Sequence, residues 1–231
     1  IGGLVHTNNG KIVASEFDAS DGNGLIYAYN RNVETTIISS IAGFVVSNTG
    51  EISMSNVKVG QTTLSQSTYI GNMSAKDISA GFVYSNTGSI YDAYVNLTRI
   101  GENNNTFSGF VNSNSGTINR TYTFINNGNK SSSVVNMFAP QNTTGITNSI
   151  EIMNITAGYN NRIENLTTLN LEERFVISNY SDLGFTFGDN TSAVWTQTTL
   201  GVLPSLVVEG ETVTPAHTFR VGDSATVEIE G

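Results

Sequence analysis

The sequence predicts an all-β chain built as a parallel β-helix, a solenoid in which short strands stack upon one another. Three observations predict this fold. A ten-residue phrase recurs along the chain, short runs of alternating apolar residues follow it, and no window of comparable length combines helical spacing with helix caps. One such unit cannot bury its apolar face alone, so we expect the units to stack.

The recurring phrase is G-(F/L)-V-x-x-N-x-G-x-I. Aligned without gaps, it occupies residues 3–12, 24–33, 43–52, 81–90 and 109–118, and a degenerate copy occupies 137–146. The copies start 21, 19, 38, 28 and 28 residues apart, and about 20 to 30 residues is the size of one solenoid coil. The 38-residue interval is either one coil with a long loop or two coils, one of them degenerate.

Each copy predicts two short strands joined by a turn at N-x-G and followed by a variable polar loop. The second and tenth positions of the phrase are predicted to point inward. The second positions hold Leu4, Leu25, Phe44, Phe82, Phe110 and Phe138, and the tenth positions hold Ile12, Val33, Ile52, Ile90, Ile118 and Ile146. Alternating apolar residues continue the second strand, for example at Val57 and Val59.

The sixth and eighth positions predict structural roles for Asn and Gly. Stacked identical amides can hydrogen-bond along a stack of strands, so we expect a ladder of aromatic rings and amides. Its predicted members are Phe44, Phe82, Phe110 and Phe138 with Asn48, Asn86, Asn114 and Asn142, and Asn8 extends it if Tyr29 is the exception. The eighth position holds Gly10, Gly50, Gly88 and Gly116, where we expect a corner with positive φ.

The phrase resembles the GLUG repeat of large secreted prokaryotic surface proteins, including filamentous-haemagglutinin-like adhesins and the non-catalytic regions of some surface peptidases. Gly2, Gly3, Leu4 and Val5 match the usual opening of that repeat, and His6 stands where the family has Gly. The resemblance covers residues 1–160. It implies a right-handed helix and a secreted or cell-surface location.

The remaining chain is predicted to contain a capping segment, 161–207, and a terminal strand or the start of a further domain, 208–231. Phe185, Phe187, Trp195 and the LPSL at 203–206 resemble the segment that follows the repeats in such proteins. We expect it to cover the end of the solenoid, because unpaired strand edges need protection. A helical turn is predicted around 171–175. The last stretch, 208–231, alternates at Val227 and Ile229, which favours an edge strand or the start of a further domain.

Composition excludes several function classes. The net charge is −9, and the ten Lys and Arg residues are scattered singly, so the positive surface that nucleic acid requires is missing. The sequence holds no run of 18 apolar residues, so we expect no membrane-spanning segment. Without Cys there is no disulfide and no thiolate metal site. The first residue is Ile1, so we expect a processed or excised piece of a precursor.

We expect no catalytic, cofactor-binding or metal-binding residues. His6 and His217 have no partner at catalytic or ligand spacing, and the nineteen acids do not recur at one position of the phrase. An active site assembled from separate coils is the open alternative. The stretch at 18–24, DASDGNG, offers oxygen ligands to calcium but lacks the spacing of a known calcium loop, so it is interpreted as a turn.

Ten N-x-S/T sequons occur in the chain. The candidates for glycosylation are Asn72, Asn104, Asn129 and Asn165.

The function predicted from these observations is a non-enzymatic extracellular surface protein that acts in adhesion or surface assembly through polar loops such as 65–77 and 101–106. Its expected partners are a host or neighbouring cell surface, or copies of itself. Two alternatives stay open. One is a structural subunit of a surface filament or layer, whose C-terminal strand pairs with a neighbour. The other is the non-catalytic β-helix part of a surface peptidase or polysaccharide-active enzyme.

Overall fold

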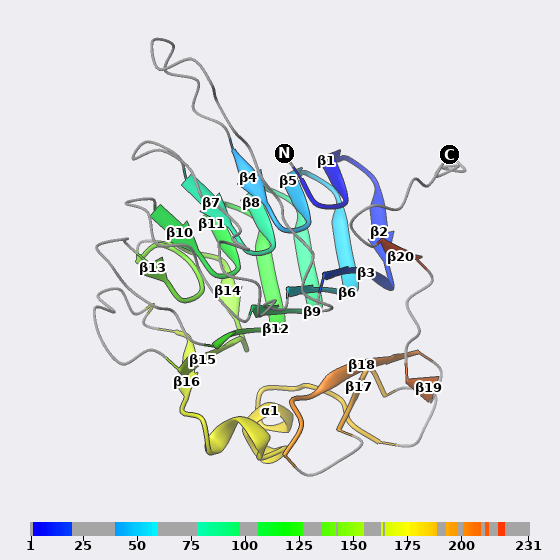
Figure 1. Ribbon diagram of the computed structural model, residues 1–231, viewed down its shortest axis with the longest axis vertical. Helices are drawn as coiled ribbons and strands as arrows, with labels where there is room; N and C mark the ends of the chain where they lie inside the picture. Colours follow the sequence, from blue (N-terminus) through cyan, green and yellow to red (C-terminus); the bar gives the residue numbers. More distant parts are fainter. Residues whose placement is uncertain are drawn as a thin grey trace, which may run out of the picture.

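Three parallel β-sheets make up most of the computed structural model (Figure 1). The structure describes residues 2–19, 40–59, 78–97, 106–126, 135–141, 143–154, 163, 165–188, 193–197, 201–208, 211–212 and 217–219. The described chain is mostly β-strand, in agreement with the all-β prediction. Helix is limited to a 3-10 turn, Glu173–Phe175, and the short α1, Ser178–Ser181. The 3-10 turn overlaps the helical turn predicted at 171–175, and α1 is a second helical turn that follows it.

The three middle repeat units each contribute a strand to all three sheets, in the same order. The first sheet has the order β1 (Val5–Asn8), β5 (Val45–Asn48), β8 (Val83–Asn86) and β11 (Val111–Asn114). The second sheet has the order β13 (Val135–Asn136), β10 (Thr106–Ser108), β7 (Ile78–Ala80) and β4 (Ile41–Ala42). A unit therefore runs from the second sheet to the first sheet and then to the long sheet described next.

The long sheet is formed by the second half of the phrase and the residues after it. Its order is β16 (Thr167–Leu169), β15 (Ile150–Asn154), β12 (Thr117–Asn126), β9 (Ser89–Leu97), β6 (Glu51–Val59), β3 (Ser15–Ala19) and β20 (His217–Phe219). Two short strands join this sheet: β2 (Lys11–Val13) pairs with β6, and β14 (Ile146–Thr147) pairs with β12. A separate antiparallel sheet holds β17 (Trp195–Thr196), β18 (Ser205–Val208) and β19 (Glu211–Thr212).

The pairing corrects two predictions about the repeat. The units after the first contain an additional strand that the sequence did not predict, because a strand of two or three residues precedes the Gly-Phe or its equivalent. The copy predicted at 24–33 lies outside the described residues, and β1 pairs directly with β5, so no strand stands between them. The direct pairing of β5 with β8 likewise makes the 38-residue interval a single unit with an insertion.

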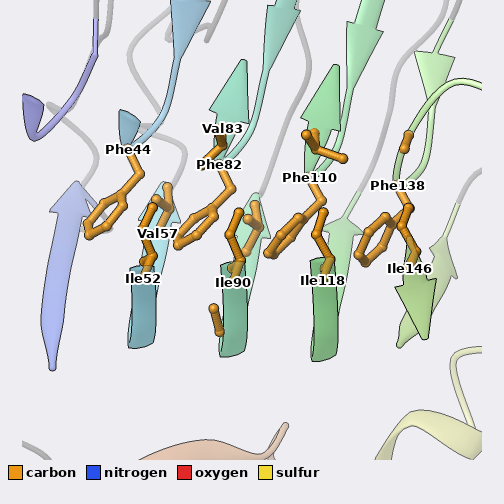
Figure 2. Packing of buried hydrophobic residues seen from close by; sticks show 14 of the residues in the cluster. Phe44, Ile52, Val57, Phe82, Val83, Ile90, Phe110, Ile118, Phe138 and Ile146 are labelled. Carbon is orange, nitrogen blue, oxygen red and sulfur yellow. The ribbon is translucent and has the colours of Figure 1, made fainter. Parts of the chain in front are cut away.

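Like residues lie directly above like residues in the core. The rings of Phe44, Phe82, Phe110 and Phe138 stack with centroids 4.7 to 4.8 Å apart and interplanar angles of 6° to 26°. Figure 2 shows this row of rings beside the isoleucines of the long sheet. The ring spacing equals the distance between neighbouring strands, so the register of the sheets sets the stacking. Truncating a buried Phe to Ala typically costs about 3–5 kcal/mol.

Asparagine amides form a second column inside the same units. The Nδ2 of Asn8 donates to Oδ1 of Asn48 at 2.7 Å, Asn48 donates to Asn86 at 2.7 Å, and Asn86 donates to Asn114 at 2.6 Å. Asn142, the next predicted member, lies outside the described residues. The Asn114 amide donates instead to the carbonyl oxygen of Thr144 at 2.6 Å.

The glycines at the eighth position have a different role from the predicted one. The positive-φ glycines of the described chain are Gly145, Gly184, Gly188 and Gly201, so Gly50, Gly88 and Gly116 do not need the left-handed region. These positions hold glycine because the backbones of neighbouring units approach closely there. A Cβ on Gly88 would lie 2.0 Å from the carbonyl oxygen of Gly50 in the preceding unit.

The left-handed corner falls at other residue types, once in each unit. Ala14, Met54, Asp92, Arg120 and Asn148 have φ of 48° to 50°. The residue after the corner is small, and its hydroxyl often bridges the bend: Ser55 Oγ donates to the carbonyl oxygen of Ser53 at 2.8 Å, as Ser149 does to Thr147. This local hydrogen bond helps to offset the cost of about 1–2 kcal/mol of a left-handed non-glycine residue.

The close approach at Gly88 predicts a strong effect of one methyl group. Gly88→Ala should lower the free energy of unfolding by at least about 2 kcal/mol, because backbone atoms must move apart. The matched control is Gly10→Ala, at the same position of the first copy, where an added Cβ meets no atom within 4 Å. It should leave stability unchanged or raise it by up to about 1 kcal/mol. Urea denaturation measures both, and equal midpoints for the two variants would contradict the close-approach explanation.

Candidate functional site

The outer face of the long sheet carries a second apolar cluster. Strands β9, β12, β15 and β16 place Tyr94, Tyr122, Phe124, Ile150, Ile152 and Leu169 in this cluster, apart from the phenylalanine core. The C-terminal segment, described at residues 170–188, 193–197 and 201–208, covers these side chains with Tyr180, Phe185, Trp195 and Leu206. In Figure 1, α1, β17 and β18 lie beneath the long sheet.

This arrangement corrects the predicted capping role in part. Ile163 and Leu166 of the predicted segment pack against the phenylalanine core. Tyr180, Phe185, Trp195 and Leu206 pack instead on the side of the long sheet, because the outward residues of β12 and β15 are apolar and need cover. The sheet edges are occupied differently. Strand β16 pairs with β15 at one edge, and the C-terminal β20 pairs with β3 at the other, with Phe219 opposite Phe17. Strand β20 lies within the predicted terminal strand 208–231, whereas Val227 and Ile229 lie outside the described residues.

Asp92 fixes the C-terminal segment to the sheet. This carboxylate is 4% exposed and accepts hydrogen bonds from Nε and Nη2 of Arg120 at 2.9 and 2.7 Å. It also accepts one from the indole Nε1 of Trp195 at 3.0 Å. Arg120 is the left-handed corner residue of the next unit, so the ion pair joins equivalent positions. A second long-range bond runs from the Tyr122 hydroxyl to the carbonyl oxygen of Pro204 at 2.6 Å.

Phenol groups in this interface stay protonated at neutral pH. Burial raises the pKa of the Tyr94 and Tyr122 hydroxyls well above their ordinary value, and the carboxylates of Glu16 and Asp18 add to the effect at Tyr94. Burial also raises the pKa of Tyr180. Desolvation disfavours a phenolate because its charge loses contact with water.

An exposed ionic group lies elsewhere on the long sheet. The Glu51 carboxylate accepts a hydrogen bond from the Tyr91 hydroxyl at 2.5 Å and pairs with Lys11 Nζ at 2.9 Å. The hydrogen bond from Tyr91 and then the one from Lys11 lower the pKa of Glu51, and the same contacts raise the pKa of Tyr91 and of Lys11. Glu51 is therefore an ionised acceptor at neutral pH.

A pocket of about 440 Å³ opens where the C-terminal segment leaves the sheet. The sheet supplies Lys58, Tyr94, Asn96, Tyr122 and Phe124, and the segment supplies Arg174, Phe175 and residues 201–205. This volume is within the usual range of small-molecule pockets. The lining combines aromatic rings with cationic and amide groups, which makes the pocket the candidate functional site.

Arg174 is the charged group at one end of this pocket. Its guanidinium carbon lies 4.2 Å from the ring centroid of Phe175 and 5.1 Å from that of Phe124. Within the described chain its Nε is buried and has no hydrogen-bond partner. Partial burial lowers the pKa of Arg174, but a guanidinium stays protonated at neutral pH.

None of the sequence-predicted site residues that the structure describes lines this pocket. The phenylalanine and asparagine columns are internal, as far as the described residues extend. Asn165 is exposed in a turn, whereas Asn72, Asn104 and Asn129 lie outside the described residues. His6 is exposed and contacts the Thr7 hydroxyl at 3.0 Å. The stretch at 18–24 is described only at Asp18 and Ala19.

No group of three or more His, Cys, Asp or Glu residues suited to a metal ion occurs in the described ranges. Neither helix of the described chain has the length and apolar character needed to cross a membrane. Comparison with protein-family models, with curated proteins and with solved structures finds no match for this chain.

Sequence reasoning missed Arg174, Asn96 and Lys58 as pocket residues. Asn96 and Phe124 face each other in neighbouring strands, and Lys58 faces Asn96 from the other side. Positions of equal register in the long strands were available from the repeat, so this row could have been found. Arg174 carried no such signal, because it lies in a segment without repeats.

The Asp92 contacts predict that this residue holds the C-terminal segment in place. Asp92→Ala should lower the free energy of unfolding by about 2–3 kcal/mol, less than for a fully buried pair because the Arg120 side chain is 29% exposed. Trp195 is the only tryptophan and is fully buried. Its fluorescence emission should therefore shift to longer wavelength in Asp92→Ala, because release of the segment exposes the indole to water. Asp182→Ala, at an exposed acid of the same segment, is the control. Unchanged Trp195 emission in Asp92→Ala would show that the segment stays docked without the carboxylate.

Proposed function

We propose that the repeat units form a right-handed parallel β-helix that displays variable segments on a secreted or cell-surface protein without enzymatic activity. Support for the fold comes from the strand order, since the three middle units contribute strands to the second, first and long sheets in turn. The stacked phenylalanine rings and the asparagine column add to it, because both need successive units to follow the same path. The resemblance to the GLUG repeat supports the location.

One observation carries the display function. Residues 20–39, 60–77, 98–105 and 127–134 differ in length, yet each follows a strand of the long sheet and precedes a strand of the second sheet. Successive units therefore begin and end these segments at the same corner. The described strands that flank these segments stack in the same way whatever the length of the segment between them. We propose adhesion to a host or neighbouring cell surface, or to copies of the chain, through these segments.

Replacing one variable segment tests this function. Exchange of residues 60–77 for a short Gly-Ser linker should abolish attachment of protein-coated fluorescent beads to bacterial or epithelial cells, measured by flow cytometry. The melting temperature should change little, because closure entropy depends weakly on loop length. The control is Val176→Ser with Ile177→Ser, at exposed apolar residues of the C-terminal segment. Equal attachment of the wild-type protein and the linker variant would refute display by this segment.

A filament or layer subunit is the second candidate, and β20 is the observation that favours it. This C-terminal strand extends the long sheet by parallel pairing with β3 of the same chain. The same pairing made with a neighbouring copy would join subunits edge to edge.

The filament candidate predicts that assembly depends on a backbone donor in β20. If copies associate in this way, Thr218→Pro should reduce the oligomers seen by sedimentation velocity, because proline removes an N–H group and disfavours a paired strand. Thr218→Val keeps the donor and should leave them unchanged. A monomeric wild-type protein at high concentration would exclude this candidate.

A further inference from the structure

The pocket beneath the long sheet contains polar groups that the described chain leaves without partners. The Tyr94 side chain is 3% exposed, and its hydroxyl makes no hydrogen bond to any described residue. The Asn96 amide, in the same strand, makes none either. Asn96 is half-buried, so solvent can reach its amide, whereas Arg174 Nε is a buried pocket atom without a partner and costs free energy unless a ligand satisfies it. The pocket is therefore equipped to bind a ligand that offers several hydrogen-bonding atoms.

The two ends of the pocket differ in charge. Lys58, Asn96 and Phe124 occupy equal register positions in three neighbouring strands, and Arg174 lies over Phe124. At the Lys58 end, the ammonium is already paired with the buried carboxylate of Glu16. At the other end, no carboxylate of the described chain contacts the Arg174 guanidinium. The unneutralised positive charge thus lies at one end only.

Guanidinium geometry selects the charged part of the ligand. Arginine presents parallel N–H donors that match a carboxylate. The rings of Phe124 and Phe175 hold the guanidinium plane, so little freedom is lost when the ligand binds. A carboxylate is therefore the group expected at this end.

The rest of the lining selects the remainder of the ligand. Asn96 can donate and accept hydrogen bonds, and Tyr94 and Ser205 add hydroxyl groups. Phe175 and Leu203, which are half-buried, offer apolar surface beside them. A ring with hydroxyl groups around its rim and C–H groups on its face fits both features. From this combination we propose that the pocket binds an acidic sugar, with its carboxylate on Arg174 and its hydroxyl groups toward Asn96 and Tyr94.

This proposal goes beyond the display function and depends on different residues. The variable segments begin and end at the corner between the long and second sheets, whereas the pocket is lined by the outer face of the long sheet and the C-terminal segment. A sugar site here would give the protein a fixed specificity beside its variable surface. Failure of one proposal leaves the other standing.

Isothermal titration calorimetry of the full chain tests the proposal. The probes are the methyl glycosides of glucuronic acid and N-acetylneuraminic acid, the neutral methyl glucoside and sodium acetate, all at 150 mM salt. At least one acidic sugar should bind, and methyl glucoside and acetate should bind at least tenfold more weakly. A response to only one acidic sugar identifies which of the two the pocket accepts.

Variants locate the binding in the pocket. Arg174→Gln should weaken the binding of the acidic sugar at least tenfold, and Arg174→Lys should restore only part of it. Asn96→Ala should weaken it several-fold and keep the fold, since the amide has no partner in the described chain. Lys11→Gln removes one positive charge at an exposed ion pair and should leave the affinity unchanged.

Four results would overturn the proposal. They are the absence of heat with either acidic sugar, equal affinity for methyl glucoside, equal affinity for acetate, and equal weakening by Lys11→Gln and Arg174→Gln. If Arg174→Gln does not fold, an Asn96→Ala protein with unchanged melting temperature and unchanged affinity would also overturn it. Replacement of residues 60–77 should not alter sugar binding, which separates this test from that of the display function.

Discussion

Parallel pairing without a shift in register is the constraint on which the rest of the structure depends. Val45 pairs with Val83, and Val83 with Val111, so every side chain lies beside its equivalent in the next unit. Only residues that stack on themselves suit the interior under this constraint. Phenylalanine does so through its ring face, and asparagine does so because one amide both donates and accepts. Insertions cannot enter the phrase without breaking both columns, so differences in length collect outside it.

The sequence revealed those parts of the fold that the repeat makes visible. Phe82 and Asn86 were assigned to internal columns because the same residue types recur at the same positions. Gly88 was also selected, but its predicted positive φ was wrong, since recurrence shows that a position needs Gly and does not distinguish a left-handed turn from close packing of backbones. The left-handed corner that the structure does contain was not predicted, because unrelated residue types occupy it, including Met54 and Asp92. A two-residue strand such as Ile41–Ala42 is too short to show alternation.

The position of the C-terminal segment was not predictable from local pattern. Its main anchor joins Trp195 to Asp92 across 103 residues, and no spacing rule connects two such positions. The outward residues of the long sheet did hold a signal. In the strand Thr117–Asn126, Tyr122 and Phe124 alternate with Thr123 and Ile125, so both faces carry buried side chains. Strands that are apolar on both faces are covered on both, which argues for a segment along the side of the sheet.

The pocket forms because the outer face of the long sheet changes from polar to apolar along the sheet. Along one row of the long sheet, Lys58 and Asn96 give way to Phe124 and then Ile152, so the sheet becomes apolar toward its later strands. The C-terminal segment covers the apolar part and leaves the polar part open. A cavity forms at the boundary, where aromatic rings that need cover meet polar groups that cannot be buried without partners. The phenylalanine and asparagine columns repeat one residue type from unit to unit, whereas neighbours on the outer face differ from strand to strand. That freedom lets a repetitive scaffold build a pocket with chemically distinct ends.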